Sequence, residues 1–374
     1  MAKKKKTSKV KPLGSAPNIG IGRRPAQRQV DKLDREILQL LNRRAEMALQ
    51  RSTGNGVKNG ASVLTDTPVL EAILKQNKGP LSEDSIRAIF REVLSSSRAI
   101  VALKRVAFLG PEFTYSHLAA IEFFGQSTDL VAVGTIGTVF EEVERGDCDY
   151  GIVPIENSTD GRVVDSLTNL AQSSVRISGE VPLRIHHCLL ATCARGKVER
   201  VFSKPQALSQ CRNWLGQHLP QANLVEVTST AEAARTAAQT THTAAIASAQ
   251  AGVNHGLDLL ARNIEDNLDN VTRFAVIGAE SGPRTGNDKT SLVFEIHHHP
   301  GALADAMGVF KRHRLNMTWI ESFPLPGQRG RDVFFVEFEG HSTQLRPRRA
   351  LESLGKKAVR LTVLGSYAQA EPIG

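Results

Sequence analysis

Cysteines are scarce in this chain, and long apolar runs are missing. Only four of its 374 residues are cysteines, and none belongs to a CxxC pair. Four thiols are too few to cross-link a chain of this length. We therefore expect Cys148, Cys188, Cys193 and Cys211 to be reduced and no metal to be bound. No stretch comes near the roughly 18 apolar residues that a membrane span needs. The first residues, MAKKKKTSKVKP, lack the apolar core of a secretory signal, so we expect a cytoplasmic protein.

Acidic residues are missing from the beginning of the chain, and this locates the net charge. Residues 1–24 hold eight of the 47 Lys and Arg residues and none of the 38 Asp and Glu residues. The remainder is nearly neutral, with 39 bases against 38 acids. The formal charge of +9 therefore belongs to a basic tail, which we expect to be disordered and solvated, with transient binding to a polyanion as the minor alternative.

Residues 25–103 show a helical pattern and no strand pattern. Apolar residues recur at intervals of three and four from Val30 to Ala48, which predicts one long amphipathic helix. The segment 54–60 (GNGVKNG) ends it, and two further helices are predicted at 68–76 and 82–103. Three such helices have few ways to bury their apolar stripes alone, so we expect this region to dimerise.

From residue 104 to 281, short apolar runs alternate with helical segments. This alternation predicts an α/β domain with a parallel sheet and room for two lobes. Ligands of such folds bind outside the carboxyl ends of the strands, so the polar residues after each strand are candidates for a site. The predicted strands are 106–110, 130–134, 150–155, 200–203, 224–227, 244–248 and 273–278.

A third pattern follows in residues 290–367. Strands and helices alternate in the order βαββαβ, which is that of the ferredoxin-like split unit. The chain as a whole is thus predicted to be multidomain, with an α, an α/β and an α+β part. In the last part, strands are expected at 292–298, 317–325, 332–340 and 359–365 and helices at 302–313 and 348–357.

Three predicted strand ends of the α/β domain run into hydroxyl-rich turns before a helix: GPEFTYSHLAA, PIENSTDGRVVDSL and TSTAEAA. A helix N-terminus with free N–H groups and hydroxyls can bind a carboxylate or a phosphate. Each turn alone could be only a helix cap, but three in one domain favour a site for a small anion. Nucleotides are disfavoured, because neither GxxxxGK[ST] nor GxGxxG occurs.

These turns, together with two further motifs, resemble those of prephenate dehydratases. FLGPEFTYSHLAA, YGIVPIENSTDG, VFSKPQAL and NVTRF follow one another between about residues 105 and 280. The following unit, with PGALADAM and WIESFPL, resembles an ACT regulatory domain. The N-terminal helices, with DKLDREILQLLNRRAEMA and IFREVLSSSRAI, resemble the chorismate mutase that is fused to such dehydratases in bifunctional P-proteins.

The resemblance implies both a fold and a reaction. The middle domain would have two lobes, as periplasmic binding proteins do, and the chain would form a homodimer or a larger homo-oligomer. It would decarboxylate prephenate and expel the ring hydroxyl as water, giving phenylpyruvate on the route to L-phenylalanine. Aromatisation drives this reaction, so no cofactor is expected. The protein must hold two carboxylates, assist a poor leaving group and exclude water.

The resemblance also assigns residues to the dehydratase site. Thr272 would be the hydroxyl closest to the chemistry, Arg273 would attract the anion or orient the loop, and Phe274 would shield the ring. A Thr hydroxyl is a very weak acid, so we expect Thr272 to donate a hydrogen bond to the departing oxygen rather than a full proton. A surface ion pair is the alternative for Arg273. The expected substrate-binding residues are Thr114, Ser116, Glu156, Asn157, Ser158, Ser203, Gln206, Ser229 and Thr230.

Two positions depart from the dehydratase pattern. Phe113 stands where the family has a glycine, which suggests that the backbone there is not strictly left-handed. Lys204 stands where the family has a histidine, and it keeps a cation available near an anionic ligand.

The C-terminal unit carries most of the pattern of an amino-acid effector site. The matching residues are Gly301, Ala302, Leu303, Ala304, Glu321 and Ser322. The family places them between two subunits, around phenylalanine. Phe323, however, replaces the family's arginine, and this removes a charge-assisted hydrogen bond worth ~1.5–3 kcal/mol. We therefore expect inhibition by phenylalanine to be weak or tuned to another ligand. His297, His298 and His299 are expected to be solvated.

The mutase-like site keeps fewer of the family's residues. Chorismate rearrangement is pericyclic, so its catalysis is electrostatic and needs about three cations and a donor to the ether oxygen. Arg44 and Ser97 match the family, whereas an early arginine falls on Gln27, with Arg28 one residue away. The other family positions fall on Asn55, Thr65, Asp66 and Val101.

We therefore predict a mutase fold with weak or absent mutase activity, with Arg28, Arg44 and Ser97 as its remaining site. The alternative is a fully bifunctional enzyme in which Arg28, Arg51 or Lys58 replaces the lost cations. A third hypothesis assigns the chain to a different class of protein, a non-catalytic sensor of anions and amino acids. In that case Thr272 is only a cap.

Overall fold

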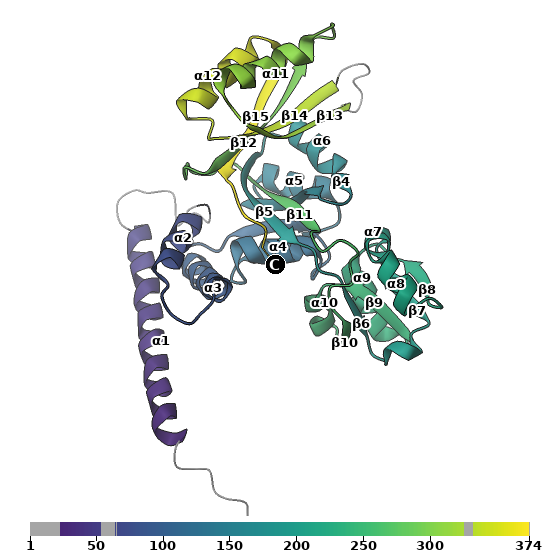
Figure 1. The fold of residues 1–374 in the computed structure, drawn as a ribbon. Coiled ribbons are helices and arrows are strands. Elements are labelled where there is room, and N and C mark those ends of the chain that lie inside the picture. Colours follow the sequence, from purple (N-terminus) through teal and green to yellow (C-terminus); the bar gives the residue numbers. More distant parts are fainter. Residues whose placement is uncertain (1–22, 54–63, 65, 325–331, 374) are drawn as a thin grey trace, which may run out of the picture.

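Figure 1 shows a computed structural model of the chain, which describes residues 23–53, 64, 66–324 and 332–373. Most of the predicted basic tail lies outside the described residues, as do Asn55, Lys58 and Thr65. None of the described helices is both long enough and apolar enough to pass through a lipid bilayer.

The N-terminal part is helical, as predicted. It consists of α1 (Arg23–Thr53), α2 (Asp66–Gln76) and α3 (Glu83–Val101). Ser82 directly precedes α3, and its side chain caps the helix by accepting from the N–H of Ser85. α1 packs along α3 and extends away from the rest of the chain in Figure 1. Its apolar stripe remains exposed at Val30, Leu33, Ile37, Leu38, Leu40 and Met47.

The middle part has two lobes, each built on one sheet. The lobe A sheet has the order β2-β1-β3-β11-β5, with β4 paired to β3. Its parallel strands β1 to β3 are covered by helices, and β11 runs antiparallel between β3 and β5. The elements of lobe A are β1 (Arg105–Leu109), α4 (Tyr115–Phe124), β2 (Asp129–Val133), α5 (Ile136–Arg145), β3 (Tyr150–Asn157), β4 (Gly161–Arg162), α6 (Val164–Gln172), β5 (Arg176–Arg184) and β11 (Val271–Gly278).

Lobe B has a five-stranded sheet of order β10-β6-β9-β7-β8. Strands β7, β8 and β9 are parallel, and β6 and β10 join antiparallel. Its elements are β6 (Cys188–Ala191), η2 (Arg195–Lys197), β7 (Arg200–Ser203), α7 (Pro205–Gln210), α8 (Arg212–His218), β8 (Asn223–Glu226), α9 (Thr230–Gln239), β9 (Thr243–Ala247), α10 (Ala249–Asn254) and β10 (Asp258–Ala261).

Both sheets are mixed, which corrects the prediction of a parallel sheet. All seven predicted strands are present, but β4, β5, β6 and β10 were not predicted. β5 (RISGEVPLR) contains Gly179, Glu180 and Pro182, which are depleted in strands. A glycine is needed at position 179 because the Phe123 ring lies over it. A Cβ atom there would come within 2.8 Å of this ring. The carboxylate of Glu180 is paired with Arg273 and Lys289.

Two adjacent segments join the lobes. The chain leaves lobe A after β5, through residues 185–187, and returns through residues 262–270 to β11. The two segments are hydrogen-bonded to each other, from Ile185 N to the Asn270 carbonyl at 2.8 Å and from Ile264 N to the His187 carbonyl at 3.0 Å. This pair of segments, which we call the hinge, holds the two lobes in one arrangement.

The C-terminal unit has the predicted βαββαβ order and an antiparallel sheet of order β13-β14-β12-β15. Two helices cover one face of this sheet (Figure 1), and its other face shares a core with lobe A through Phe335 and Tyr367. The elements are β12 (Asp288–Ile296), α11 (Ala302–His313), β13 (Met317–Pro324), β14 (Asp332–Glu339), α12 (Leu345–Gly355) and β15 (Ala358–Ala368). Beyond them, Ile373 returns to β5, where its N–H donates to the Pro182 carbonyl.

Candidate functional site

Thr272 lies at the start of β11, directly beside the end of β3. Its register partner on β3 is Asn157. Asn157 Oδ1 accepts from the backbone N–H groups of Thr159 and Asp160, each at 3.0 Å. A backbone N–H can only donate, so these two contacts fix which end of the Asn157 amide is oxygen. The amide nitrogen Nδ2 therefore faces Thr272.

This orientation decides how the Thr272 hydroxyl is used. Asn157 Nδ2 donates to Thr272 Oγ1 at 2.8 Å and to Asn270 Oδ1 at 3.0 Å. Because Thr272 Oγ1 accepts from Asn157, its own hydrogen remains available for a further acceptor. The Thr272 hydroxyl can therefore donate a hydrogen bond at the end of the strand.

A chain of polar groups continues from Asn270 through the hinge. Asn270 Nδ2 donates to Gln210 Oε1 at 3.1 Å, and His187 Nε2 lies 2.9 Å from the same oxygen. His187 Nδ1 lies 3.0 Å from the Tyr115 hydroxyl, and Gln210 Nε2 donates to Asp160 at 2.9 Å. Burial lowers the pKa of His187, so this side chain is neutral near pH 7. The chain of contacts ties lobe A, the hinge and α7 of lobe B together.

Sequence reasoning missed these connecting residues. Asn270 is the first residue of the NVTRF motif and Tyr115 lies in the FTYS turn, so both stood in recognised motifs without being given a role. His187 and Gln210 belong to no recognised motif and become partners only through the fold.

Phe113 brings lobe A into contact with lobe B. Its φ is 66°, so the prediction that this backbone is not left-handed was wrong. Phe113 N donates to His117 Nδ1 at 3.0 Å, and its ring packs against the hydrophobic cluster of lobe B and lies 6.3 Å from the His255 ring. The hydroxyl of Ser248, which directly follows β9, donates to the Phe113 carbonyl at 3.5 Å. The strand ends of the two lobes therefore adjoin at this turn.

Two predicted substrate-binding residues lie on that same turn. Thr114 caps α4, with Oγ1 accepting from His117 N at 3.4 Å and donating to the Pro111 carbonyl at 2.9 Å. Ser116 follows in the first turn of α4, and both side chains are largely buried. Their hydroxyls are thus placed at a helix N-terminus that faces the other lobe.

The predicted residues of lobe B all lie at or shortly after strand ends, but one of them is inaccessible. Ser229 caps α9 by accepting from Glu232 N at 3.1 Å, and Thr230 begins that helix. Gln206 and Lys204 are exposed at the start of α7. Ser203, however, is fully buried and donates to the Ile246 carbonyl at 2.7 Å. Its hydroxyl is used inside the sheet, which corrects its assignment to substrate binding.

Residues next to Asn157 and Thr272 face the opposite side of the sheet. Successive strand residues alternate between faces. Glu156 and Arg273 accordingly turn away from Thr272 and form an ion pair at 2.8 Å beside the C-terminal sheet. The guanidinium of Arg273 is surrounded by three carboxylates, so it is not free to attract a substrate anion. Orientation of the strand, the other role expected for Arg273, remains a prediction.

Phe274 and Ser158 complete the predicted set. Phe274 is 2 % exposed and packs in the core of lobe A with Phe108 and Val276, so in this structure it does not cover a ligand ring. Ser158 is exposed at the end of β3, where Oγ accepts from Val271 N at 2.9 Å. Ser158 therefore lies beside Asn157 and the start of β11. Ser229 and Thr230 belong to lobe B. That they bind the same substrate molecule as Thr272 stays a prediction.

The predicted effector residues lie on one side of the C-terminal unit. Gly301 has a φ of 86° and begins α11, whose first residues are Ala302, Leu303 and Ala304. On β13, Glu321 forms an ion pair with Arg162 of lobe A, and Ser322 is exposed. Phe323 is 2 % exposed in the core shared with lobe A. The residue that replaces the family's arginine has therefore become a core residue.

The mutase-like residues are only partly gathered. Arg44 reaches the Ser97 hydroxyl and donates to the Val93 carbonyl at 3.3 Å. Burial lowers the pKa of Arg44 and lowers the pKa of the neighbouring Arg98 to about 10. Arg98, which sequence reasoning missed, is paired with Asp66. Gln27, Arg28 and Arg51 are exposed on α1, and Val101 is half-buried at the end of α3.

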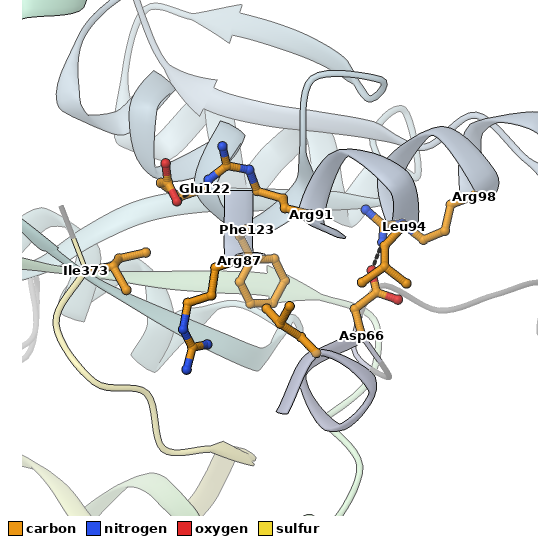
Figure 2. Close-up of a pocket in the computed structure, with 9 residues that line it drawn as sticks. Asp66, Arg87, Arg91, Leu94, Arg98, Glu122, Phe123 and Ile373 are labelled. Atoms are coloured by element: carbon orange, nitrogen blue, oxygen red, sulfur yellow. Dashed lines mark hydrogen bonds and ion pairs between the residues drawn. The ribbon is translucent and has the colours of Figure 1, made fainter. Parts of the chain in front are cut away.

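A cavity of about 130 Å³ lies where the helical part meets lobe A. Figure 2 shows arginines of α3 around it, with α4 opposite and Ile373 at its edge. Each arginine has a carboxylate partner: Glu71 for Arg87, Glu122 for Arg91 and Asp66 for Arg98. The cavity is thus charge-compensated. Its lining residues are Asp66, Leu70, Arg87, Arg91, Leu94, Arg98, Glu122, Phe123 and Ile373.

Two lobes on a two-segment hinge, with hydroxyls and helix N-termini at adjoining strand ends, form an arrangement that is suited to binding a small anion. Residues 106–282 match the family model for prephenate dehydratase. The bifunctional chorismate mutase/prephenate dehydratase of Aquifex aeolicus is 40% identical over 354 residues, which cover 92% of this chain and 97% of that protein. Its counterpart in Stutzerimonas stutzeri is 39% identical over 351 residues, which cover 91% and 96%.

A solved structure agrees with this match. Prephenate dehydratase from Arthrobacter aurescens, in complex with L-Phe, has a TM-score of 0.67 and 32% identity, covering 71% of this chain and 90% of its own. The chain belongs to the prephenate dehydratase family.

Proposed function

We propose that the chain converts prephenate to phenylpyruvate, carbon dioxide and water at the junction of the two lobes. Thr272 donates a hydrogen bond to the ring oxygen that departs. The electrons of the breaking carbon–carboxylate bond move into the ring and carbon dioxide is released. The departing oxygen leaves as hydroxide, which takes a proton from solvent to become water. The observation that carries this proposal is the fixed Asn157 amide, which leaves the Thr272 hydrogen free.

The remaining residues act by holding the dianion. Ser229 and Thr230, at the N-terminus of α9, hold one carboxylate from lobe B. Thr114 and Ser116 at the N-terminus of α4, with Ser158, line the lobe A side. Contact through Phe113 keeps the lobes together, which excludes water from the reacting groups. Lys204 and Gln206, exposed at the start of α7, supply a cation and an amide at the rim.

The chain divides, in this proposal, into a dehydratase domain at 104–281, a mutase-like helical domain at 25–103 and an ACT domain at 290–367. The helical domain dimerises through the exposed apolar stripe of α1. Its mutase activity is weak or absent. Arg44 contacts Ser97, but among the described residues no further cation that could replace the lost ones is in contact with this pair. Full bifunctionality is the alternative, favoured by the names of the relatives.

One experiment tests both activities. The purified full chain is given prephenate and chorismate separately, and phenylpyruvate and prephenate are quantified by ultraviolet absorbance and chromatography. We expect phenylpyruvate from prephenate at enzymatic rates and little conversion of chorismate. Absence of phenylpyruvate from the prephenate reaction would refute the proposed function. Chorismate turnover at rates typical of enzymes, about 1–10³ s⁻¹, would establish the bifunctional alternative instead.

We also propose that the ACT domain binds an amino acid between Gly301 and Glu321 of two subunits. The solved relative binds L-Phe. Here Phe323 is buried and cannot supply the arginine's charged contact, and the loss of ~1.5–3 kcal/mol corresponds to about 10- to 150-fold weaker binding. Phenylalanine is expected to inhibit only at high concentration. The check is a titration of dehydratase activity, with tyrosine and tryptophan as comparison ligands; strong inhibition at micromolar phenylalanine would contradict it.

A further inference from the structure

Five charged side chains meet where the lobe A sheet faces the C-terminal sheet. Glu156, Arg273 and Glu180 lie on β3, β11 and β5, which are neighbouring strands, and Lys289 and Glu337 lie on β12 and β14. The side chains of Glu180 and Glu337 are 1% and 0% exposed, and that of Arg273 is 17% exposed. Burying charge is costly, so each group requires partners. We call these five residues the interface charge cluster.

Arg273 is at the centre of the interface charge cluster. Its Nη1 donates to Glu156 at 2.8 Å, and its Nη2 donates to Glu180 at 2.9 Å and to Glu337 at 2.8 Å. Its guanidinium also lies 5.3 Å from the centre of the Trp319 ring. Burial alone lowers the pKa of Arg273, but Glu337 and Glu180 outweigh this effect and raise the pKa well above its ordinary value. Arg273 is therefore charged and fixed in place.

Glu337 is held from the side of the C-terminal unit. Its Oε1 accepts from Ser291 Oγ at 3.0 Å and from the Tyr367 hydroxyl at 2.8 Å, while Oε2 accepts from Arg273. Burial raises the pKa of Tyr367, so this hydroxyl stays protonated and remains a donor. One carboxylate oxygen is thus anchored in the C-terminal sheet, and the other is one of the three acceptors that hold the Arg273 guanidinium.

The position of Arg273 bears directly on Thr272. The two residues are consecutive on β11, paired with Glu156 and Asn157 of β3. Regular pairing between β11 and β3 is interrupted immediately afterwards, by a register shift between Arg273 and Phe274. A bulge weakens the constraint that the hydrogen-bond ladder places on a strand end. On its other side, the first residues of β11 pair regularly with β5, where Thr272 lies opposite Leu183. Side-chain anchoring of Arg273 therefore supplements the β5 ladder on the β3 side, where the pairing is interrupted.

We propose that Glu337, acting through Arg273, is a positioning residue for the Thr272 hydroxyl. The C-terminal unit thereby completes the dehydratase site without touching the substrate. This inference rests on the proposed function, in which Thr272 donates to the departing oxygen. Because Glu337 acts on the donor and not on the groups that hold the carboxylates, its loss lowers kcat and leaves KM nearly unchanged.

The test is the Glu337→Gln variant, which has nearly the same shape. It removes the negative charge beside Arg273 and leaves at most a neutral amide oxygen as an acceptor, so the guanidinium keeps charged partners only in Glu156 and Glu180. Misplacement of a reacting group by up to 1 Å lowers rates by up to ~10²-fold, so we expect kcat to fall about 10-fold. The matched control is Glu339→Gln, two residues further along β14, where the carboxylate is exposed and accepts from Asn316 at 2.8 Å.

A spectroscopic readout is independent of activity. The chain has two tryptophans, so in a Trp214→Phe background Trp319 reports alone. Release of Arg273 from Glu337 changes its distance from the Trp319 ring, so Glu337→Gln is expected to shift the Trp319 emission while Glu339→Gln does not. If the unaltered chain made no phenylpyruvate, the proposed function would fail, and the emission would still show whether Glu337 holds Arg273.

Two results would overturn the inference: a kcat of Glu337→Gln equal to that of the unaltered chain, or an equal loss of kcat in Glu337→Gln and Glu339→Gln. If Glu337→Gln does not fold, Tyr367→Phe replaces it, because that change removes one of the two donors to Glu337 Oε1. A smaller fall in kcat, about two- to fivefold with KM unchanged, is then expected. Unaltered kcat in Tyr367→Phe would equally overturn the role of Glu337.

Discussion

Thr272→Ala is expected to lower kcat for prephenate by ~10²–10³-fold, the scale of losing one preorganised donor in an active site. The substitution removes the hydroxyl that Asn157 orients and leaves the Asn157 amide bonded to Asn270, so the local fold persists. Steady-state kinetics with prephenate checks it. KM should change little, because the carboxylates are held by other residues.

Thr272→Ser is the matched control for this change. It keeps the hydroxyl, and with it the acceptor for Asn157 and the donor for the substrate, so kcat should stay within about 10-fold of the unaltered enzyme. Thermal midpoints of both variants separate a loss of chemistry from a loss of folding. Full activity in Thr272→Ala would mean that Thr272 is only a structural residue.

Asn157→Asp is expected to have a similarly large effect for a different reason. A carboxylate accepts hydrogen bonds and cannot donate them. The oxygen that replaces Nδ2 would take the Thr272 hydrogen for itself and would face Asn270 Oδ1, which is 3.0 Å from Nδ2. The Thr272 hydroxyl would then point at residue 157 and away from the substrate. We expect kcat to fall by ~10²-fold, although the Thr272 side chain is untouched.

Much of the fold follows from local patterns in the sequence. The buried strands of both lobes are continuous apolar runs such as VAFL and AAIA, and the amphipathic stripes of α1 and α3 recur at helical spacing. β5 could not be recognised in this way. Its Glu180 is compatible with a buried strand only because Arg273 and Lys289, 93 and 109 residues away, supply opposite charge.

In the candidate site, too, some features are recognisable from the local sequence and others depend on distant contacts. Helix caps such as Thr114 and Ser229 are visible in the sequence, because a cap needs only its own next few residues. Strand alternation explains why Arg273 faces away from Thr272, although the sequence led us to expect both residues at the site. The orienting contacts among Asn157, Gln210 and His187 could not be predicted, since their partners are brought together by the hinge. Phe113 adopts its left-handed backbone for a similar reason, namely its packing on the other lobe.

The central claim is that the Asn157 amide leaves the Thr272 hydrogen free to be donated. It is tested most directly by kcat for prephenate in Asn157→Asp, measured beside Asn169→Asp. Asn169 lies on α6, where its amide bonds only the Asp165 carbonyl of its own helix, at 2.8 Å. We expect a kcat lower by ~10²-fold for Asn157→Asp and an unchanged kcat for Asn169→Asp. Equal turnover by the two folded variants would contradict it.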